Sequence, residues 1–383
     1  MLVGVAVSVP LCLALVGAPA SAAPAADVSV VAAHGEKVAG QYIVTLKSGA
    51  SVGSVTSAAS VKPLFTYRAA LHGFAAKLST GQLQSLQRNS GVARIEQDQV
   101  AHATTTQSSP TWGLDRTDEH YLPMDAKYTY TYTGYKIRAY VIDTGIQANH
   151  PQFGGRALAV YDAVGDGQNG NDCNGHGTHV AGTIGSTTYG VAKRAYLRAV
   201  RVLDCTGSGS YAGVIAGVDY VTANHVGSAV ANMSLGGGYS QDVNDAVTAM
   251  VNSGVFTSVA AGNSSANACD STPASASAVM TVAASDKTDA SAYFTNYGSC
   301  VETYAPGVDI KSTWIGSTTN TISGTSMASP HVAGVAALYR EKYATASQFS
   351  IFAYILNATT KGQISGIPDP YTPNRLLYKV STL

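Results

Sequence analysis

The chain is organised around the segment SGTSMASPHVAG, which occupies residues 323–334. Gly324 permits a tight approach of the backbone, and Thr325 and Ser326 are residue types that cap the start of a helix. The free N–H groups of such a helix start would favour a developing negative charge near the hydroxyl of Ser326. Pro330 falls early in the helix, where a missing N–H is tolerated. The segment alone fits an ordinary capped core helix as well as a nucleophilic serine.

Composition excludes several classes of protein. The chain has 383 residues, of which 45% are apolar and 12% charged, so it is globular and long enough for one large or two unequal domains. The formal net charge is zero, and Lys and Arg form no cluster along the sequence. We therefore expect neither nucleic acid nor an anionic membrane as a partner.

Residues 1–23 predict a secretory signal peptide. An apolar run from Val3 to Val16 is followed by small residues of the Ala-x-Ala type around Ala20. The run is too short to span a bilayer comfortably, which disfavours a membrane anchor. We therefore expect a secreted, extracellular protein.

The cysteines favour disulfide bonds. Five are present, and Cys12 would leave with the signal peptide. An even number in an exported chain favours two disulfides over free thiols. Three pairings of the remaining four are possible, and pairing in sequence order closes the shortest loops; the four are Cys173, Cys205, Cys269 and Cys300. Metal binding is disfavoured because no Cys-x-x-Cys motif occurs.

Residues 41–98 predict a compact β-α-β-β-α-β unit. Its strand-like and helical patterns lie at residues 41–46, 53–59, 73–78, 80–87 and 92–96. Residues 24–39 before it and residues 102–109 after it are predicted to be linkers.

Beyond these linkers, strands and helices alternate, which predicts parallel strands with helices on both faces of the sheet. The β-rich runs lie at residues 137–142, 196–202, 228–232 and 255–260, and the helical patterns at 179–185, 211–224 and 243–252. Ligands bind beyond the carboxyl ends of the strands in such folds. Residues that follow the strands are therefore candidates for a functional site.

Three residues have the chemistry for acyl transfer. Asp143 directly follows a strand, His176 lies in a glycine-flanked helix start, and Ser326 lies in the opening segment. A serine hydroxyl is a poor nucleophile until an imidazole takes its proton, and the imidazole needs a carboxylate to fix its tautomer and stabilise its cation. The order Asp, His, Ser excludes an α/β-hydrolase, in which the serine comes first.

Three segments resemble the signature blocks of subtilisin-like serine endopeptidases: DTG at 143–145, HGTHVAG at 176–182 and GTSMASPH at 324–331. Others narrow the resemblance to the proteinase K branch, nearest the aqualysin-type bacterial enzymes, namely WGLDR at 112–116, YGVAK at 189–193, SLGGG at 234–238 and STW at 312–314. The resemblance implies a three-layer α/β fold with a mainly parallel twisted sheet. It also implies the disulfides Cys173–Cys205 and Cys269–Cys300.

The resemblance also implies which residues bind substrate. Asn263, with the backbone N–H of Ser326, would hold the oxyanion of the tetrahedral intermediate. Two segments resemble edge strands that would hold the peptide between them by main-chain hydrogen bonds. Tyr211 would line an S4 pocket, and a third segment would line an uncharged S1 pocket. The three segments are Gly207, Ser208 and Gly209; Ser234, Leu235 and Gly236; and Ala260, Ala261 and Gly262. We therefore expect broad specificity with apolar or aromatic P1 residues preferred.

Catalysis would need no cofactor, but the resemblance implies structural calcium. One family site would gather the carboxylates of Asp115, Asp118, Glu119 and Asp125, although Lys127 replaces a usual ligand there. A solvated acidic turn is the alternative.

A second calcium site would use backbone oxygens near Ser277 and Val279 with Glu302, where the family has an aspartate. The Asp position of a third site holds Gln363, so we expect no ion there. His179 is expected to be structural, because no glutamate occupies the position that a zinc motif needs.

Residues 41–98 resemble the inhibitor-type propeptide of these enzymes, with YIV at 42–44 and GFA at 73–75 as its marks. The domains would then be a signal peptide at 1–23, a small α+β ferredoxin-like propeptide at 24–104 and a peptidase domain at 105–383. The propeptide would chaperone folding and inhibit the enzyme until self-cleavage between Ala101 and Thr106. An unrelated ferredoxin-like binding domain is the alternative.

The sequence thus predicts a secreted serine endopeptidase, made as an autoprocessed zymogen, that acts as a monomer on proteins and peptides. A catalytically inactive binding protein would need a broken triad or oxyanion position, and none is broken. A lipase or esterase would need another chain order and a lipid-sized cleft. A processing protease of narrow specificity would need acidic residues in the substrate pockets, and the matched positions hold none.

Overall fold

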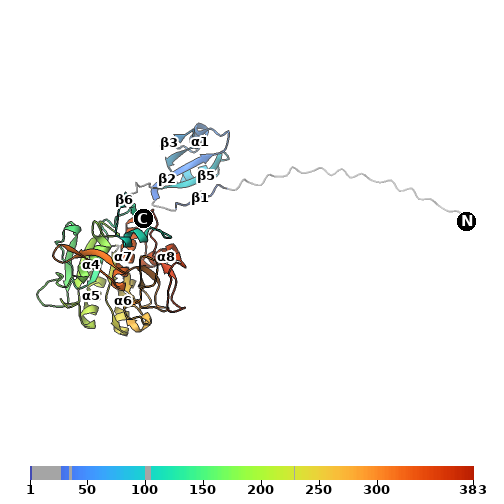
Figure 1. Cartoon of the computed structure of the whole chain (residues 1–383). Coiled ribbons are helices and arrows are strands. Elements are labelled where there is room, and N and C mark those ends of the chain that lie inside the picture. Colours follow the sequence, from blue (N-terminus) through green and yellow to red (C-terminus); the bar gives the residue numbers. More distant parts are fainter. Residues whose placement is uncertain (2–26, 34–36, 100–104, 228) are drawn as a thin grey trace. The chain divides into compact units, whose positions relative to one another are not determined.

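The computed structural model describes residues 1, 27–33, 37–99, 105–227 and 229–383 (Figure 1). The chain divides into two compact units, Met1–Ala101 and His102–Leu383. The predicted signal peptide, apart from Met1, and most of the predicted self-cleavage segment lie outside the described residues. None of the helices in the described part of the chain has the length and apolar character needed to cross a membrane.

The first unit is an α+β domain with the strand order β1-β5-β2-β4-β3. Its elements are β1 (Val30–Val31), β2 (Lys37–Leu46), α1 (Val52–Ala58), β3 (Phe65–Tyr67), β4 (Gly73–Lys77), α2 (Thr80–Gln87) and β5 (Val92–Gln99). Ser79 caps α2 in a capping box with Gln82. The predicted ferredoxin-like unit is confirmed. The linker assigned to residues 24–39 is wrong in part, because residues 30–31 pair with β5 and residues 37–39 extend β2.

The second unit is built on a nine-stranded sheet of order β19-β20-β16-β15-β13-β11-β8-β10-β9. Its strands are β8 (Arg138–Asp143), β9 (Ala157–Asp162), β10 (Tyr196–Arg201), β11 (Ala229–Met233), β13 (Phe256–Ala260), β15 (Met280–Ser285), β16 (Thr303–Pro306), β19 (Thr360–Lys361) and β20 (Arg375–Leu376). All neighbouring pairs are parallel except β19 with β20. The predicted mainly parallel sheet is confirmed.

Helices cover both faces of this sheet. They are α3 (Trp112–Thr117), α4 (His176–Gly185), α5 (Tyr211–Asn224), α6 (Gln241–Asn252), α7 (Thr325–Lys342) and α8 (Gln348–Ala358). Successive residues of a strand point to opposite faces, so Val141 of β8 packs in the core with α4 and α7 while Ile142 packs in the core with α5 and α6. The arrangement is the predicted three-layer α/β fold.

Shorter elements complete the second unit. They are the antiparallel pairs β6 (Thr105–Ser108) with β7 (Lys127–Tyr130), β12 (Gly237–Gly238) with β14 (Ser271–Thr272) and β17 (Ile310–Trp314) with β18 (Thr318–Ile322), and the single turns η1 (Pro151–Phe153) and η2 (Ala268–Asp270). The linker predicted at residues 102–109 is therefore wrong for residues 105–108. Their main chain pairs with β7, and the hydroxyls of Thr106 and Thr129 lie 3.2 Å apart across this pair.

Candidate active site

The carboxylate of Asp143 and the ring of His176 meet at the end of a strand. Asp143 is the last residue of β8 and is fully buried. Its Oδ1 accepts hydrogen bonds from the backbone N–H of Thr144 at 2.7 Å and from Nδ1 of His176 at 2.8 Å. With the proton of the neutral ring on Nδ1, Nε2 of His176 is the free acceptor.

Two glycines let a helix begin beside that strand end. His176 is the first residue of α4, and the preceding Gly175 has a left-handed φ of 113°. A Cβ at Gly175 would overlap the indole of Trp314, and a Cβ at Gly177 would overlap the carbonyl oxygen of Gly145. Glycine at both positions therefore allows the imidazole to approach Asp143.

Asp172 fixes the loop that carries His176, and the sequence reasoning did not single it out. It is buried and accepts from the backbone N–H groups of Asn174, Gly175 and Thr178 and from the hydroxyls of Thr144 and Thr178. The sequence pattern that could have pointed to Asp172 is an aspartate two residues before an Asn-Gly pair. Such a pattern is typical of a side chain that organises a turn.

The pKa of His176 reflects these neighbours. Burial of the ring lowers this pKa, but the charge and hydrogen bond of Asp143, followed by the charge of Asp172, outweigh burial. The pKa of His176 is therefore raised above 6.5. The side chain keeps 25% of its surface exposed, so the ring can exchange protons at the cavity.

Ser326 lies in the first turn of α7, but the capping predicted there is wrong. The N-cap is Gly324, which has no side chain to cap the helix; the backbone N–H of Thr325 donates instead to Oδ1 of Asn263 at 2.8 Å. The hydroxyl of Thr325 instead accepts from the backbone N–H of Gly262 at 3.1 Å and donates to Oδ1 of Asn263 at 2.9 Å. The hydroxyl of Ser326 donates to the carbonyl oxygen of Ser234 at 3.2 Å. Both hydroxyls are thus engaged by neighbouring segments and are not available to the helix.

Between the described side chains of Ser326 and His176 there is no hydrogen bond. The hydroxyl of Ser326 turns on a single side-chain torsion, so a change of rotamer redirects it. Catalytic hydrogen bonds often tighten only when substrate is present.

Pro330 lies deeper in the helix than the sequence suggested. It is the sixth residue of α7, so its missing N–H leaves the carbonyl of Ser326 without the usual helical partner. The hydroxyl of Ser234 donates to that carbonyl at 2.8 Å. A substitute bond from outside the helix therefore holds the backbone of Ser326.

A chain of polar side chains supports this substitute bond. Nδ2 of Asn232 donates to the hydroxyl of Ser234 at 2.8 Å, and Oδ1 of Asn232 accepts from the hydroxyl of Ser329 at 2.7 Å. The hydroxyls of Ser329 and Ser258 are 2.8 Å apart. All four side chains are buried, so the network links β11 and β13 to α7.

Asn263 is oriented by Thr325. Its Oδ1 accepts from the backbone N–H of Thr325 at 2.8 Å as well as from the hydroxyl. Two donors at one end of the amide require the oxygen there, which assigns the NH₂ group to the other end. Among the described residues, no acceptor engages that NH₂ group.

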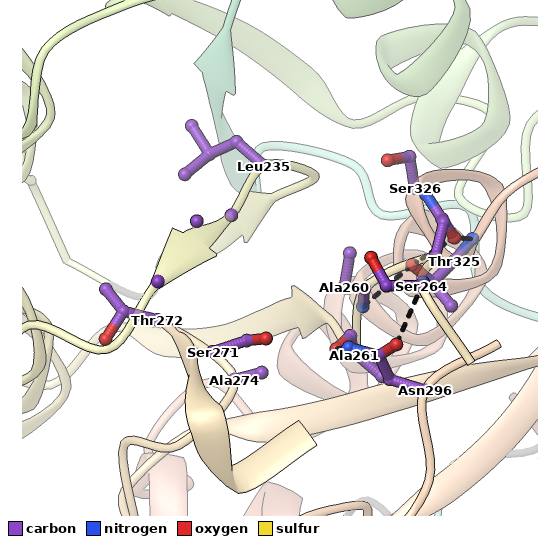
Figure 2. A pocket seen from close by; sticks show the side chains of 15 residues that line it. Leu235, Ala260, Ala261, Ser264, Ser271, Thr272, Ala274, Asn296, Thr325 and Ser326 are labelled. Atoms are coloured by element: carbon purple, nitrogen blue, oxygen red, sulfur yellow. Dashed lines mark hydrogen bonds between the residues drawn. The ribbon is translucent and has the colours of Figure 1, made fainter. Parts of the chain in front are cut away.

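Two adjoining cavities surround these groups. The first has a volume of about 470 Å³, and Figure 2 shows Leu235 and Thr272 on one side of it with Thr325 and Ser326 on the other. The second, also about 470 Å³, is lined by His176 and shares Leu235 and Gly236 with the first.

The ten residues predicted to contact substrate all line one of these cavities. Ala260, Ala261 and Gly262 line the first, residues 207–209, Tyr211 and Ser234 line the second, and Leu235 and Gly236 line both. Residues 207–209 and 234–236 are not hydrogen-bonded strands, because each segment lacks a paired neighbour along its length. Asn296 was missed; it lines the first cavity, and its amide bonds the backbone of Ala261, Ser264 and Ala266.

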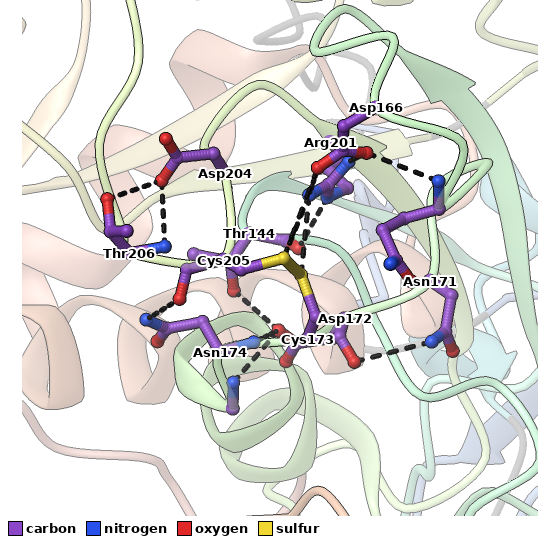
Figure 3. The surroundings of a disulfide bond; sticks show 12 residues. Thr144, Asp166, Asn171, Asp172, Cys173, Asn174, Arg201, Asp204, Cys205 and Thr206 are labelled. Atoms are coloured by element: carbon purple, nitrogen blue, oxygen red, sulfur yellow. Dashed lines mark hydrogen bonds and ion pairs between the residues drawn. A yellow bond between two sulfur atoms is a disulfide. The ribbon is translucent and has the colours of Figure 1, made fainter.

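Both disulfides have the pairing that the resemblance implied, Cys173–Cys205 and Cys269–Cys300. Figure 3 shows the first, which joins the loop before His176 to the segment that lines the second cavity. Nδ2 of Asn174 adds a bond to the carbonyl of Cys205 at 3.1 Å. Beside the sulfurs, the buried Arg201 pairs with Asp166 at 2.6 Å and with Asp162 at 3.1 Å.

Three of the four carboxylates predicted for the first calcium site come together. Oxygens of Asp115, Glu119 and Asp125 lie within 4.8 Å of one another. Burial raises the pKa of Asp115 and of Glu119, and Oδ1 of Asp115 is buried without a hydrogen-bond partner. Asp118 is outside this group; its Oδ2 accepts from the backbone N–H of Thr129, and burial raises its pKa to about 7. Lys127 pairs with Asp125 at 3.4 Å.

The other predicted metal-site residues lie apart from this group. Oε2 of Glu302 accepts from the backbone N–H of Thr281, two residues after Val279, and burial raises the pKa of Glu302 to about 8. Ser277 is exposed, and its role stays a prediction. His179 is buried, shares a 2.9 Å hydrogen bond with the carbonyl of Ile310, and has its pKa lowered to about 4 by burial.

Comparison with known proteins agrees with this geometry. Residues 136–372 match the subtilase family and residues 41–104 match the peptidase inhibitor I9 family. The chain is 52% identical over 314 residues to an extracellular serine proteinase of Thermus sp. (strain Rt41A), covering 82% of this chain and 76% of that protein. It is 43% identical over 347 residues to proteinase R of Parengyodontium album, covering 88% of each.

A solved structure gives the same result. The crystal structure of a cold-adapted subtilisin-like serine proteinase superposes with a TM-score of 0.70 at 47% identity, covering 71% of this chain and 99% of that one. The family match spans more than half of the chain, and the predicted resemblance is confirmed. The chain belongs to the subtilase family of serine endopeptidases and carries an inhibitor I9 domain ahead of its peptidase domain.

Proposed function

We propose that Asp143, His176 and Ser326 form the catalytic triad of this endopeptidase. The observation that carries the proposal is the 2.8 Å bond between Asp143 and Nδ1 of His176, which leaves Nε2 free beside the cavities that His176 and Ser326 line. Ser326 attacks the scissile carbonyl while Nε2 of His176 takes its proton, and Asp143 stabilises the resulting cation. His176 then protonates the leaving amine. A water molecule then attacks the acyl-enzyme in the same way, with His176 again taking the proton, and the acyl group is released from Ser326.

Asn263 and the backbone N–H of Ser326 serve as the oxyanion donors. The bonds from Thr325 to Oδ1 of Asn263 support this role, because they leave both N–H groups of the amide for the substrate. Such donors stabilise charge that develops only in the transition state. The substitute bond from Ser234 to the carbonyl of Ser326 positions the nucleophile's backbone for the same step.

Specificity follows from the lining of the cavities. No charged side chain lines the first cavity, and Ala260, Ala261 and Ala274 give it apolar walls. We propose that it accepts apolar or aromatic P1 residues and that the second cavity, with Tyr211, takes residues further toward the amino end of the substrate. Main-chain recognition makes the overall specificity broad.

A peptide library tests this function. Digestion by the mature enzyme is expected to show Phe, Tyr, Leu and Ala at P1 ahead of Asp, Glu, Lys and Arg, since a charged P1 group would be buried without a partner. A serine-directed sulfonyl fluoride should stop the digestion, which separates this activity from a contaminating metalloprotease. A dominant Lys or Arg at P1, or cleavage of one sequence only, would contradict the proposal.

The I9 match supports an inhibitor role of the first unit within its own chain. We propose domains at 1–23, 24–104 and 105–383, with cleavage of the precursor between Ala101 and Thr106 and secretion guided by residues 1–23. The match ends at residue 104, and the relative from Thermus is named as extracellular, which supports both parts of the proposal.

Calcium would stabilise the peptidase domain through the carboxylates of Asp115, Glu119 and Asp125. Three mutually close carboxylates, two with raised pKa values, fit a divalent cation, whose charge would offset their repulsion. Chelation is expected to lower the melting temperature of the mature enzyme by roughly 5–10 °C, the effect of losing a ligand present at about a hundred times its Kd.

Paired variants locate the ion. Asp115→Asn should shrink the difference between the melting temperatures with and without chelator. Asp118→Asn should leave that difference unchanged, because this carboxylate lies outside the group. Equal melting temperatures of the parent enzyme with and without chelator would rule out a tight site.

A further inference from the structure

Five cationic side chains gather where strands of the large sheet begin, although they come from separate parts of the sequence. They are Lys136, Arg138, Arg156, Arg194 and Arg198, at or near the starts of β8, β9 and β10. We call this group the basic rim. Asp143 closes β8 five residues after Arg138, so the rim lies about 16 Å from the active-site edge at 3.3 Å per residue.

The strand register places two of the rim residues, Arg138 and Arg198, on one face of the sheet. Arg138 of β8 pairs with Tyr196 of β10, and Arg198 pairs with Tyr140 on one side and Leu158 on the other. Residues in register on neighbouring strands point to the same face of a sheet, so the two arginines, the tyrosines and Leu158 share it.

Tyrosine rings lie between the cations. Nζ of Lys136 is 5.2 Å and Cζ of Arg194 is 4.3 Å from the ring centroid of Tyr135. Cζ of Arg198 is 5.5 Å from the ring of Tyr196, and the two tyrosine rings are 6.4 Å apart. Two cations therefore lie over the ring of Tyr135 and one lies over the ring of Tyr196.

The charges of the basic rim have no carboxylate partners. Across the described residues, none of the five cations forms an ion pair, whereas Arg116 and Arg201 pair with aspartates. Glu341, on the flank of the rim, accepts from the backbone N–H groups of residues 133 and 134.

Backbone carbonyls fix three of the arginines in place. Arg156 donates to the carbonyls of Gly185 and Ala195 at 2.7 and 2.8 Å, and Arg138 donates to that of Val226 at 3.0 Å. Arg198 donates to the carbonyl of Arg156 at 3.1 Å. Carbonyl bonds orient a guanidinium without cancelling its charge, so these three arginines present fixed and uncompensated positive charge.

A cavity opens between these groups. It has a volume of about 320 Å³ and is lined by Arg156, Leu158, Tyr196 and Arg198, with Leu158 54% exposed. Guanidinium groups bind carboxylates through two parallel hydrogen bonds, and Leu158 offers an apolar surface to the aliphatic stem of a glutamate.

We propose that the basic rim is an exosite that binds acidic segments of protein substrates while another part of the same substrate occupies the active site. This inference rests on the proposed endopeptidase function, which brings polypeptides to the surface. A carboxylate ligand is favoured over nucleic acid, because single-stranded nucleic acid needs free aromatic faces on which bases can stack. Lys136 and Arg194 lie over the ring of Tyr135 and Arg198 lies over that of Tyr196, which leaves less ring surface for stacking.

The test compares tailed reporter peptides with the mature enzyme. One fluorogenic peptide with Phe at P1 is extended through a Gly-Ser spacer by ten glutamates or by ten glutamines, at either end. At low salt we expect the Glu-tailed peptide to have a kcat/KM about five-fold higher than the Gln-tailed peptide, through a lower KM, as a few exposed ion pairs provide. The difference should vanish in about 0.5 M salt.

A triple variant and a matched control locate the effect. Lys136→Gln, Arg194→Gln and Arg198→Gln together should abolish the preference for the Glu tail, because they remove a guanidinium that lines the cavity and two exposed cations beside it. Hydrolysis of the untailed peptide should be unchanged. Lys287→Gln, Lys311→Gln and Lys361→Gln remove the same charge from exposed positions outside the rim and should keep the preference. If the triple variant misfolds, Lys136→Gln with Arg194→Gln replaces it, since both of these side chains are exposed.

Each outcome has a distinct meaning. A parent enzyme that treats both tails alike, or a rim variant that keeps the preference, overturns the exosite and leaves the endopeptidase intact. Failure of the parent to cleave even the untailed peptide overturns the proposed function itself. Binding of a single-stranded oligonucleotide to the rim, with no effect of the Glu tail, would assign the surface to nucleic acid and refute the present inference.

Discussion

Ser326→Ala is expected to lower kcat by about a million-fold, the loss measured when subtilisin itself is deprived of its serine nucleophile. The substitution removes only Oγ, whose hydrogen bond in the structure goes to the carbonyl of Ser234, so the fold should persist. The precursor should also remain uncleaved, because its maturation would use the same hydroxyl. Casein digestion and the intact mass of the purified chain measure the two effects.

Ser264→Ala is a matched control. Ser264 lines the same cavity as Ser326, but only its backbone N–H takes part in a described hydrogen bond. This variant should mature and digest casein at close to the parent rate. Self-maturation and casein digestion by Ser326→Ala would exclude Ser326 as the nucleophile.

Asn263→Ala is expected to lower kcat by about 10²–10³-fold with little change in KM, corresponding to roughly 2.7–4 kcal/mol of transition-state stabilisation. This magnitude is the one known for the equivalent change in subtilisin. The loss falls on kcat because the amide donates to charge that is absent from the ground state. Steady-state kinetics on a short Phe-P1 peptide measure both constants.

The alanine variant alone is ambiguous, because Oδ1 of Asn263 also anchors Thr325. Asn263→Asp separates the two roles, since a carboxylate keeps the acceptor for Thr325 but has no N–H to give the oxyanion. Loss of kcat in both variants is the expected result. Recovery of parental kcat in Asn263→Asp would show that Asn263 acts only through Thr325.

The sequence was informative where a residue's role depends on its near neighbours. Asp143 stands at the end of a strand, and His176 is flanked by glycines that a close approach requires, so both positions could be predicted to lie at one edge of a parallel sheet. Apolar runs predicted the central strands because both of their faces are buried. The pairing of the cysteines needed the family resemblance in addition.

Features that depend on distant residues could not be predicted. The bonds from Ser234 to Ser326 and from Ser329 to Asn232 join residues separated by 92 and 97 positions. Local propensity assigned the hydroxyls of Thr325 and Ser326 to a helix cap, but neighbouring segments compete for them more effectively. The basic rim could not be seen in a chain of zero net charge, because its members come from separate segments that the pairing of β8, β9 and β10 brings together.

Pro330 interrupts the helical hydrogen bonds of α7, and this bears on the stage of folding at which the enzyme gains its activity. Because Pro330 removes the local bond to Ser326, the nucleophile is set only after β11, β13 and α7 have met, which are contacts of long sequence separation. Contacts of this kind form slowly, since loop entropy must be overcome first. We expect a nascent or half-folded chain to have no working nucleophile, so it cannot digest neighbouring unfolded copies. An attached amino-terminal domain can guide the slow formation of these distant contacts.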